Sequence, residues 1–380
     1  MSQGYGAERE PSTRNGVTRH GNSQTSESFS HHTPSHPAAS GPPERLGGGG
    51  LLHRSFRMRS HRCTAVLYRT AWTLSISILA ACTGGSDGTG PEDEGPDDPQ
   101  AQALPPCPAT PFLTVSPVAF EDIRELGPLG FLNPPGHTFP GQHMGFVTER
   151  DPATGGTMTA PVRAPGDIRI AGVVANHFEF AGNTPGDTLR QTDYTLVFFS
   201  CSDVRFYFGH VIALVPTLES AIGTFDDTEC NPPYTTGGTT NTQCSKTVSI
   251  DVEAGDLLGS MGGATQGGMD FGAADRRATP PPWANPDRFE NFDDDWGPGH
   301  VVCAADYFVP GIRGVLETMF GWDGRPRTGE PACGEYAQDV PGTAQGRWYF
   351  DDSLLEDRHL ALVHHMVDPS LGVFSVGTSI

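Results

Sequence analysis

Three histidines and one aspartate have side chains suited to metal binding and proton transfer: His137, His143, His210 and Asp270. Imidazole nitrogens and carboxylate oxygens are common zinc ligands, and histidine also exchanges protons near neutral pH. Each histidine also has a structural interpretation. His137 can be a turn residue bonded to backbone, His143 a core residue of an alternating strand, and His210 a packing residue in an aromatic strand.

Asp270 lies between two apolar residues of an expected strand. A carboxylate in such a place normally has a specific polar partner, because an unpaired buried charge is costly. Arg276 is one candidate partner, and a bound cation is the other.

Six further cysteines follow Cys82 in the chain: Cys107, Cys201, Cys230, Cys244, Cys303 and Cys333. An even number in an exported chain predicts three disulfides, although six cysteines allow 15 pairings. Cys230 and Cys244 flank a Gly, Thr and Asn loop and form the first expected pair. A zinc-cysteine site is the alternative, but the sequence contains no C-x-x-C pair.

Three other segments carry polar or aromatic groups of interest. Asp293–Asp295 is predicted to be a solvated acidic loop, with calcium binding as the alternative. His364 and His365 are adjacent on an expected strand, so they point to opposite faces and do not easily share one ion. Trp348 is predicted to pack, with sugar stacking as the alternative.

The charge of the 380-residue chain is divided unevenly. The formal charge is -21, but residues 1–81 carry nine Arg and four Glu, which leaves 15 basic and 41 acidic residues in 82–380. This acidity argues against nucleic acid as a partner, because phosphate binding needs clustered Lys and Arg. Gly 48 and Pro 34 exceed a fifth of the chain, so part of it is expected to be tail or linker.

The chain contains the pattern of an export signal. Arg59, Arg62 and Arg69 precede an apolar stretch at 71–81 that is too short to span a bilayer as a helix. Its ending, Leu-Ala-Ala followed by Cys82, resembles the lipobox of bacterial lipoproteins, which implies lipidation of Cys82 and an anchor in the membrane. An ordinary membrane-anchoring or buried apolar segment is the alternative.

The segments around this signal are expected to lack a packed core. Residues 1–57 are rich in Gly, Ser, Pro, His and Arg and are predicted to be a disordered tail, with Met58 as a candidate true start. Residues 58–81 form the signal peptide. Residues 82–106, a mixture of Gly, Pro and acids, form an extended tether. The protein is therefore expected in the cell envelope, on the periplasmic side or at the cell surface.

The remainder predicts an all-β to β-rich fold. Short segments rich in Val, Ile, Phe, Thr and Tyr alternate with Gly, Pro, Asn and Asp, which is typical of antiparallel sheets. The clearest are 168–180, 194–200, 204–215 and 248–252, with 344–350, 359–367 and 373–376 further on. The one convincing helical stretch is 315–320. A proline-rich break at 278–286 separates a β domain at 107–277 from a β-rich extension at 278–380.

Four segments, in order, are similar to motifs of the lysostaphin or LytM type of zinc endopeptidase, and together they cover about residues 130–275. They are Gly136-His137-Thr138-Phe139-Pro140-Gly141-Gln142-His143-Met144-Gly145-Phe146, Pro161-Val162-Arg163-Ala164-Pro165-Gly166-Asp167-Ile168, Phe206-Tyr207-Phe208-Gly209-His210-Val211, and Val252-Glu253-Ala254-Gly255-Asp256-Leu257-Leu258-Gly259 followed by Gly268-Met269-Asp270-Phe271-Gly272. The resemblance implies an antiparallel sheet domain of that peptidase type, acting on peptidoglycan.

The resemblance also implies a site, with departures from the family pattern. It implies a zinc ion at His137, His143 and Asp270, with His210 as a catalytic residue. Where the family has a His-x-His strand, this chain has Gly268-Met269-Asp270, so one proton-handling histidine is missing and the other is a carboxylate. General acid and base groups are typically worth about 100- to 10,000-fold in rate. We therefore expect binding of peptidoglycan, or another envelope peptide or glycan, without efficient hydrolysis; an active zinc endopeptidase is the alternative.

Overall fold

The computed structural model describes residues 104–134, 136–181, 188–236, 239–263, 267–292, 296–353 and 355–379. The chain divides into two compact units after Leu79, and every described residue belongs to the second. The predicted tail, signal peptide, lipidation site at Cys82 and most of the tether lie outside the described residues, as does Asp293–Asp295. No helix in the described ranges is long and apolar enough to cross a membrane.

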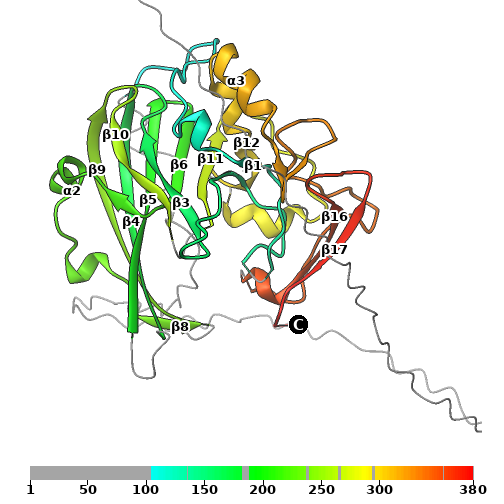
Figure 1. The fold of residues 1–380 in the computed structure, drawn as a ribbon. Helices are drawn as coiled ribbons and strands as arrows, with labels where there is room; N and C mark the ends of the chain where they lie inside the picture. The colour runs from blue at the N-terminus through cyan, green and yellow to red at the C-terminus, as the bar shows by residue number, and fades with distance from the viewer. Residues whose placement is uncertain are drawn as a thin grey trace, which may run out of the picture. The chain divides into compact units, whose positions relative to one another are not determined.

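The described residues form a β-rich fold built from several antiparallel sheets, as predicted (Figure 1). The largest is a nine-stranded sheet with the order β1-β2-β11-β6-β5-β4-β9-β8, in which β12 also pairs with β11. Its strands are β1 (Glu125–Gly127), β2 (His143–Val147), β4 (Ile168–Ala181), β5 (Thr188–Cys201), β6 (Val204–Val211), β8 (Tyr234–Thr236), β9 (Thr239–Val252), β11 (Met269–Asp275) and β12 (Val301–Val302).

One face of this sheet builds the main core. Phe198, Phe206, Phe208 and Phe271 are fully buried and stack or tilt against one another with ring centroids 4.9–6.4 Å apart. Because side chains alternate across a strand, the residues between these phenylalanines point to the opposite face. That opposite face carries the candidate site.

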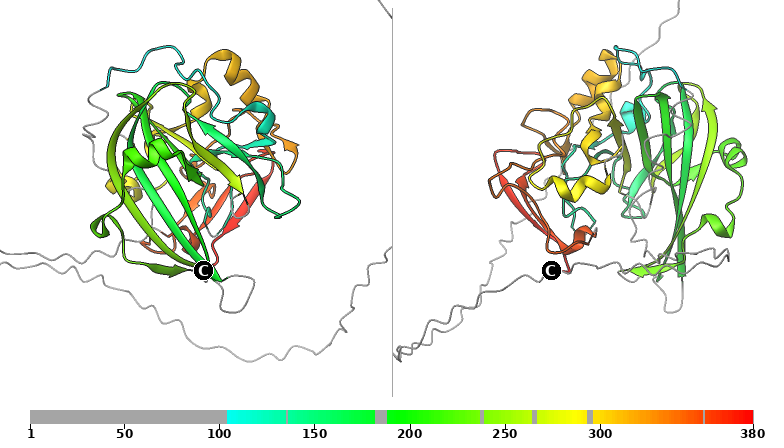
Figure 2. Two further views of the ribbon diagram at one scale, coloured as in Figure 1. Left: turned by 60° about the vertical axis from the view of Figure 1, so that its left-hand side comes forward. Right: turned by 180° about the vertical axis from the view of Figure 1, so that it is seen from behind.

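A three-stranded sheet contributes to the same core. It has the order β3-β10-β7 and consists of β3 (Thr157–Arg163), β10 (Leu257–Gly263) and β7 (Ala213–Leu214). Its buried residues Val162, Leu258 and Met261 belong to the same apolar cluster as the phenylalanines of the large sheet. Two layers therefore enclose the core of the β domain, as seen from two further directions in Figure 2.

The remaining elements are short. Two small sheets contain β13 (Gly321–Trp322) with β14 (Arg325–Pro326), and β15 (Gly346–Trp348), β16 (Leu360–His364) and β17 (Gly372–Val376). The α-helices are α2 (Pro216–Ile222) and α3 (Pro310–Glu317). The 3-10 helices are η1 (Phe120–Asp122), η2 (Asp227–Glu229), η3 (Pro286–Phe292), η4 (Pro298–His300), η5 (Ala304–Tyr307) and η6 (Glu356–Arg358).

The predicted strands are present, although several boundaries differ. The segment expected at 204–215 is divided into β6 and β7, and helix α2, which the sequence analysis did not predict, follows at once. Pro216 occupies the first turn of α2, where a backbone N–H has no acceptor within the helix, so the missing N–H costs no hydrogen bond. The helix expected at 315–320 begins earlier, at Pro310, which likewise occupies a first turn.

The three predicted disulfides are present. They join Cys107 to Cys201, Cys230 to Cys244, and Cys303 to Cys333. The first expected pair, Cys230 with Cys244, is correct, and these two residues also form an isolated β-bridge. The Cys107–Cys201 bridge closes the longest loop, with a sequence separation of 94.

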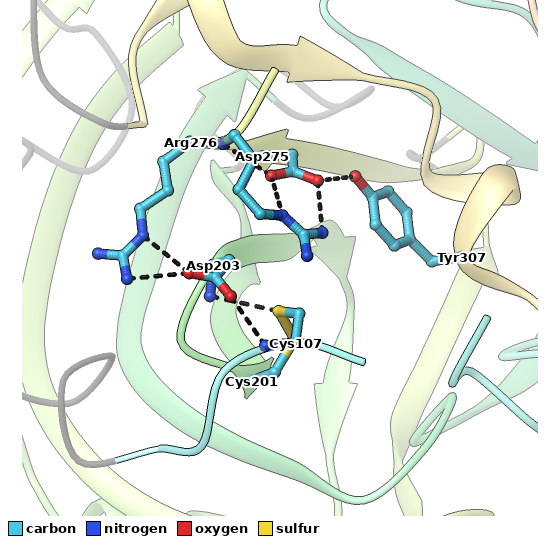
Figure 3. Close-up of polar contacts among 7 residues, drawn as sticks. Cys107, Cys201, Asp203, Asp275, Arg276 and Tyr307 are labelled. Atoms are coloured by element: carbon cyan, nitrogen blue, oxygen red, sulfur yellow. Dashed lines mark hydrogen bonds and ion pairs between the residues drawn. A yellow bond between two sulfur atoms is a disulfide. The ribbon is translucent and has the colours of Figure 1, made fainter. Parts of the chain in front are cut away.

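A charged network fixes the end of β11 beside this disulfide (Figure 3). Arg276 donates to Asp203 at 3.0 Å, and Asp203 also accepts the Cys107 backbone N–H at 2.8 Å. Asp275 accepts hydrogen bonds from Arg277 at 2.8 Å and from the Tyr307 hydroxyl at 2.6 Å. Arg276 therefore pairs with Asp203, and the suggested pairing of Arg276 with Asp270 is wrong.

We expect Tyr307→Phe to lower the free energy of unfolding by about 1–3 kcal/mol, because it removes a hydrogen bond to the buried Asp275 carboxylate and keeps the ring. Urea unfolding followed by circular dichroism measures the change. Tyr234→Phe is the control, because Tyr234 is 47% exposed. Equal stability of Tyr307→Phe and the wild type would contradict this assignment.

Candidate functional site

The four residues singled out in the sequence come together on the face of the large sheet opposite the core. Asp270 Oδ1 lies 3.3 Å from His143 Nδ1, and Asp270 Oδ2 lies 3.5 Å from His210 Nε2. The rings of His137 and His143 are in contact, with centroids 5.3 Å apart. The Asp270 carboxylate is therefore placed between two imidazoles from neighbouring strands.

Strand register explains this convergence. Asp270 on β11 is directly opposite Gly145 on β2 and Gly209 on β6. A Cβ added at Gly209 would lie 3.0 Å from Asp270 Oδ2, so glycine leaves the room that the carboxylate occupies. In the adjacent row, Gly272 lies between His143 and Tyr207, and the Tyr207 ring covers it.

His210 reaches this face because β6 contains a bulge. The pairing of β5 with β6 shifts register between Tyr194 and Leu196, which face Val211 and Phe208, so β6 has one extra residue there. His210 has a φ of 61°, in the left-handed region that non-glycine residues seldom adopt. Bulges commonly redirect a side chain near a functional site, and this one places the His210 ring beside Asp270.

A line of polar side chains continues from His210 across three more strands. Asp193 on β5 accepts a hydrogen bond from His210 Nδ1 at 2.8 Å and another from Asn176 Nδ2 at 2.9 Å. Gln243 on β9 donates to Asn176 Oδ1 at 3.1 Å. Sequence reasoning missed Asp193, Asn176 and Gln243. The signal that could have identified them is the presence of polar residues within long strands rich in β-branched side chains.

Asp193 is the deepest of these groups, with no exposed surface. An ionised carboxylate so deeply buried needs a partner of opposite charge. By itself, burial would lower the pKa of His210. The hydrogen bond with Asp193 and the charge of Asp270 outweigh burial and raise the pKa to about 9. The two carboxylates therefore favour the protonated form of His210.

His143 and His137 lie in a drier part of the site. The side chain of His143 is 5% exposed, and among the described residues its Nδ1 has the 3.3 Å contact with Asp270 but no hydrogen bond of good geometry. Phe131 packs against both rings, at centroid distances of 4.6 Å to His137 and 5.1 Å to His143. Burial, together with repulsion from His143 and His210, lowers the pKa of His137 to about 4.

Backbone bonds and a distant carboxylate hold the loop that carries His137. His137 exchanges two backbone hydrogen bonds with Asn133, at 2.9 and 3.0 Å, as the turn interpretation predicted. Glu356 accepts the backbone N–H of Phe139 at 3.0 Å. Burial raises the pKa of Glu356 to about 7, against the effect of its backbone hydrogen bonds. A residue of the C-terminal region therefore positions this loop.

The arrangement differs from the zinc site that the resemblance implied. In the described part of the chain, no three His, Cys, Asp or Glu side chains are placed so that they could hold a metal ion together. His143 and Asp270 provide two neighbouring donors, while His210 is engaged by carboxylates at both ring nitrogens. Zinc at His137, His143 and Asp270 stays a prediction, and no chemistry below depends on a metal.

Gly268, at the position where the resemblance implied a histidine, has a steric role. A Cβ added at Gly268 would lie 2.5 Å from the backbone carbonyl oxygen of Phe146 on β2. Real Cβ atoms do not approach this closely, so any side chain at 268 requires β2 or the start of β11 to move.

Comparisons with known proteins identify no relative. No family model matches the chain, and neither the curated proteins nor the solved structures contain a match. The chain is a disulfide-bonded, β-rich protein with a histidine and carboxylate cluster on one sheet face.

Nuclear magnetic resonance titration should show His210 protonated at pH 7 and titrating near pH 9, with His137 titrating near pH 4. Asp193→Asn should lower the pKa of His210, because it removes the anion bonded to Nδ1. A His210 pKa that Asp193→Asn leaves unchanged would contradict the pairing.

The same titration makes stability depend on pH. Because folding raises the pKa of His210 from its ordinary value of 6.5, the folded state binds more protons between about pH 6.5 and 9. The stabilisation due to His210 is complete below pH 6.5 and falls as pH rises to 9. Thermal unfolding measured between pH 6.5 and 9 should show a melting temperature that falls as pH rises. The fall should be smaller in His210→Gln than in the wild type.

Gly268→His should destabilise the fold by about 1–3 kcal/mol, the usual cost of overpacking, because β2 leaves no room for the side chain. Gly267→His is a matched control, since a Cβ at 267 meets nothing within 4 Å. Chemical denaturation of both variants gives the comparison. A fully stable Gly268→His protein would show that the family histidine fits.

Proposed function

We propose that this chain is an exported, lipid-anchored protein of the cell envelope whose β domain belongs to the lysostaphin-like fold type. In this proposal the domain binds peptides of peptidoglycan, or related envelope peptides, without efficient hydrolysis. The motif segments supply β2, β6 and β11 of the large sheet and parts of β3 and β10 of the three-stranded sheet that shares its core, which supports the fold type. The three disulfides support an oxidising compartment.

One observation carries the non-hydrolytic part of the proposal: both ring nitrogens of His210 face carboxylates. Nδ1 lies 2.8 Å from Asp193 and Nε2 lies 3.5 Å from Asp270. A general base needs an unprotonated nitrogen directed at the proton that it removes. His210 instead has two anionic neighbours, an arrangement that suits a fixed hydrogen-bonding surface.

The accessible groups suit a peptide ligand. The side chains of His210 and Asp270 are 41% and 24% exposed, so a donor and an acceptor lie side by side at the surface. A peptide unit presents one C=O acceptor and one N–H donor. The Nε2–H of His210, whose 3.5 Å contact with Asp270 is longer than an ordinary hydrogen bond, would donate to the carbonyl group, and Asp270 would accept from the amide. His143, buried behind Asp270, would limit the positions that the carboxylate can take.

The test uses cross-linked peptidoglycan stem peptides freed of glycan, mixed with the purified full chain. Calorimetry should detect binding in the wild type and about tenfold weaker binding, or ~1.4 kcal/mol, in Asp270→Ala and His210→Ala. Glu179→Ala is the control, because Glu179 is an exposed carboxylate on the same sheet whose partner is Arg190. Mass spectrometry of the same mixtures should show intact peptides.

Two results would overturn the proposal. Peptide cleavage that depends on His210 or Asp270 would identify an active endopeptidase, the alternative expected from the sequence. Equal peptide affinity in the wild type and both site variants would remove the cluster from ligand recognition.

A further inference from the structure

The small C-terminal sheet formed by β15, β16 and β17 has one apolar face that nothing in the described part of the chain covers. Trp348, Leu360 and Val376 form one row across its three strands. Leu362 and Phe374 form the next row on the same face. We call this surface the aromatic face and define it by its side chains: Trp348, Leu360, Leu362, Phe374 and Val376.

The two faces of the sheet differ sharply in exposure. On the aromatic face, Phe374 is 61% exposed, Trp348 48% and Val376 40%. On the opposite face, Ala361 and Val363 are at most 4% exposed and pack in a cluster with Phe139. One face of the sheet is therefore packed, and the other presents apolar rings to solvent. Trp348, which the sequence analysis expected to pack, has about half of its surface in solvent.

The Trp348 ring is held in place. Its Nε1–H donates to the backbone carbonyl of Ala344 at 2.8 Å, which satisfies the one polar group of the indole. The flat apolar surface of the ring is therefore presented to solvent in a fixed orientation. A ligand that stacks on a fixed ring loses less conformational entropy than one that must order it.

The size of the aromatic face limits its occupant. Three strands spaced about 4.8 Å apart, with five residues rising about 3.3 Å each, give a footprint of about 250 Å². A stable protein interface buries about 800 Å² on each partner. The aromatic face is therefore too small to hold a second copy of the chain by itself.

Charge limits the occupant further. None of the five side chains of the aromatic face is charged, whereas residues 82–380 carry 41 acidic and 15 basic residues. This excess of negative charge repels another copy of the chain and an anionic lipid surface. The occupant that fits is small or narrow, uncharged, and partly apolar.

Neutral sugar rings have this chemistry. A pyranose presents C–H groups on its faces and hydroxyls around its edge, and the C–H groups complement the negative face of an aromatic ring. We propose that the aromatic face binds an uncharged glycan chain, with sugar rings stacked on Trp348 and Phe374. This site is separate from the His210 and Asp270 cluster and does not rest on the proposed peptide binding.

The test titrates the purified full chain with the hexamer of N-acetylglucosamine and follows binding by calorimetry. We expect saturable binding in the wild type, at least tenfold weaker binding in Trp348→Ala and Phe374→Ala, and near wild-type affinity in Trp348→Tyr, which keeps a ring. Tyr234→Ala is the matched control, because Tyr234 is an aromatic residue of β8 with 47% exposure. Circular dichroism confirms that each variant folds.

Three outcomes would overturn this inference. One is the absence of hexamer binding at millimolar concentration, and another is full affinity in Trp348→Ala. The third is a dimer in analytical ultracentrifugation that Trp348→Ala abolishes, because that result would assign the aromatic face to a second copy. The peptide titration of Asp270→Ala is independent of all three, so either proposal can fail without the other.

Discussion

A carboxylate with no contact with solvent organises the site face of the large sheet. Asp193 is fully buried, and an unpaired charge in that position would cost several kcal/mol. Its two oxygens are satisfied by the imidazole of His210 and the amide of Asn176. The β6 bulge turns His210 towards this face and requires a left-handed backbone at His210. The bulge therefore contributes to compensating the charge of Asp193. The second carboxylate, Asp270, then lies against an imidazole that is already fixed.

Strand patterning allowed much of the fold to be predicted. The segments at 168–180 and 194–200 contain the β-branched and aromatic residues that fit a half-buried pleated surface, and they became the central strands β4 and β5. His143, His210 and Asp270 lie together because β2, β11 and β6 are neighbours in the sheet, a grouping that the sequence implied only through the resemblance. The cysteine count was sufficient for three disulfides because export favours complete pairing.

The parts that could not be predicted depend on single-residue shifts and long-range contacts. Simple alternation along β6 places Phe208 in the core and would place His210 there too, which is why packing was a fair interpretation. One extra residue reverses that orientation, and composition does not reveal it. The role of Asp193 depends on a partner 17 positions away. The exclusion of a side chain at Gly268 depends on the carbonyl of Phe146, which no local pattern indicates.

The Cys107–Cys201 bridge determines where a pull on the segment before it would enter the fold. A pull on the segment before residue 107 enters the fold at this covalent bond and at the Asp203 contact beside it, on the β5–β6 turn. The load is passed directly to β5 and does not reach the segment 112–115, whose backbone N–H groups donate to Tyr307 and Pro165. Reduction of this one bond would move the load from a covalent cross-link to these backbone hydrogen bonds.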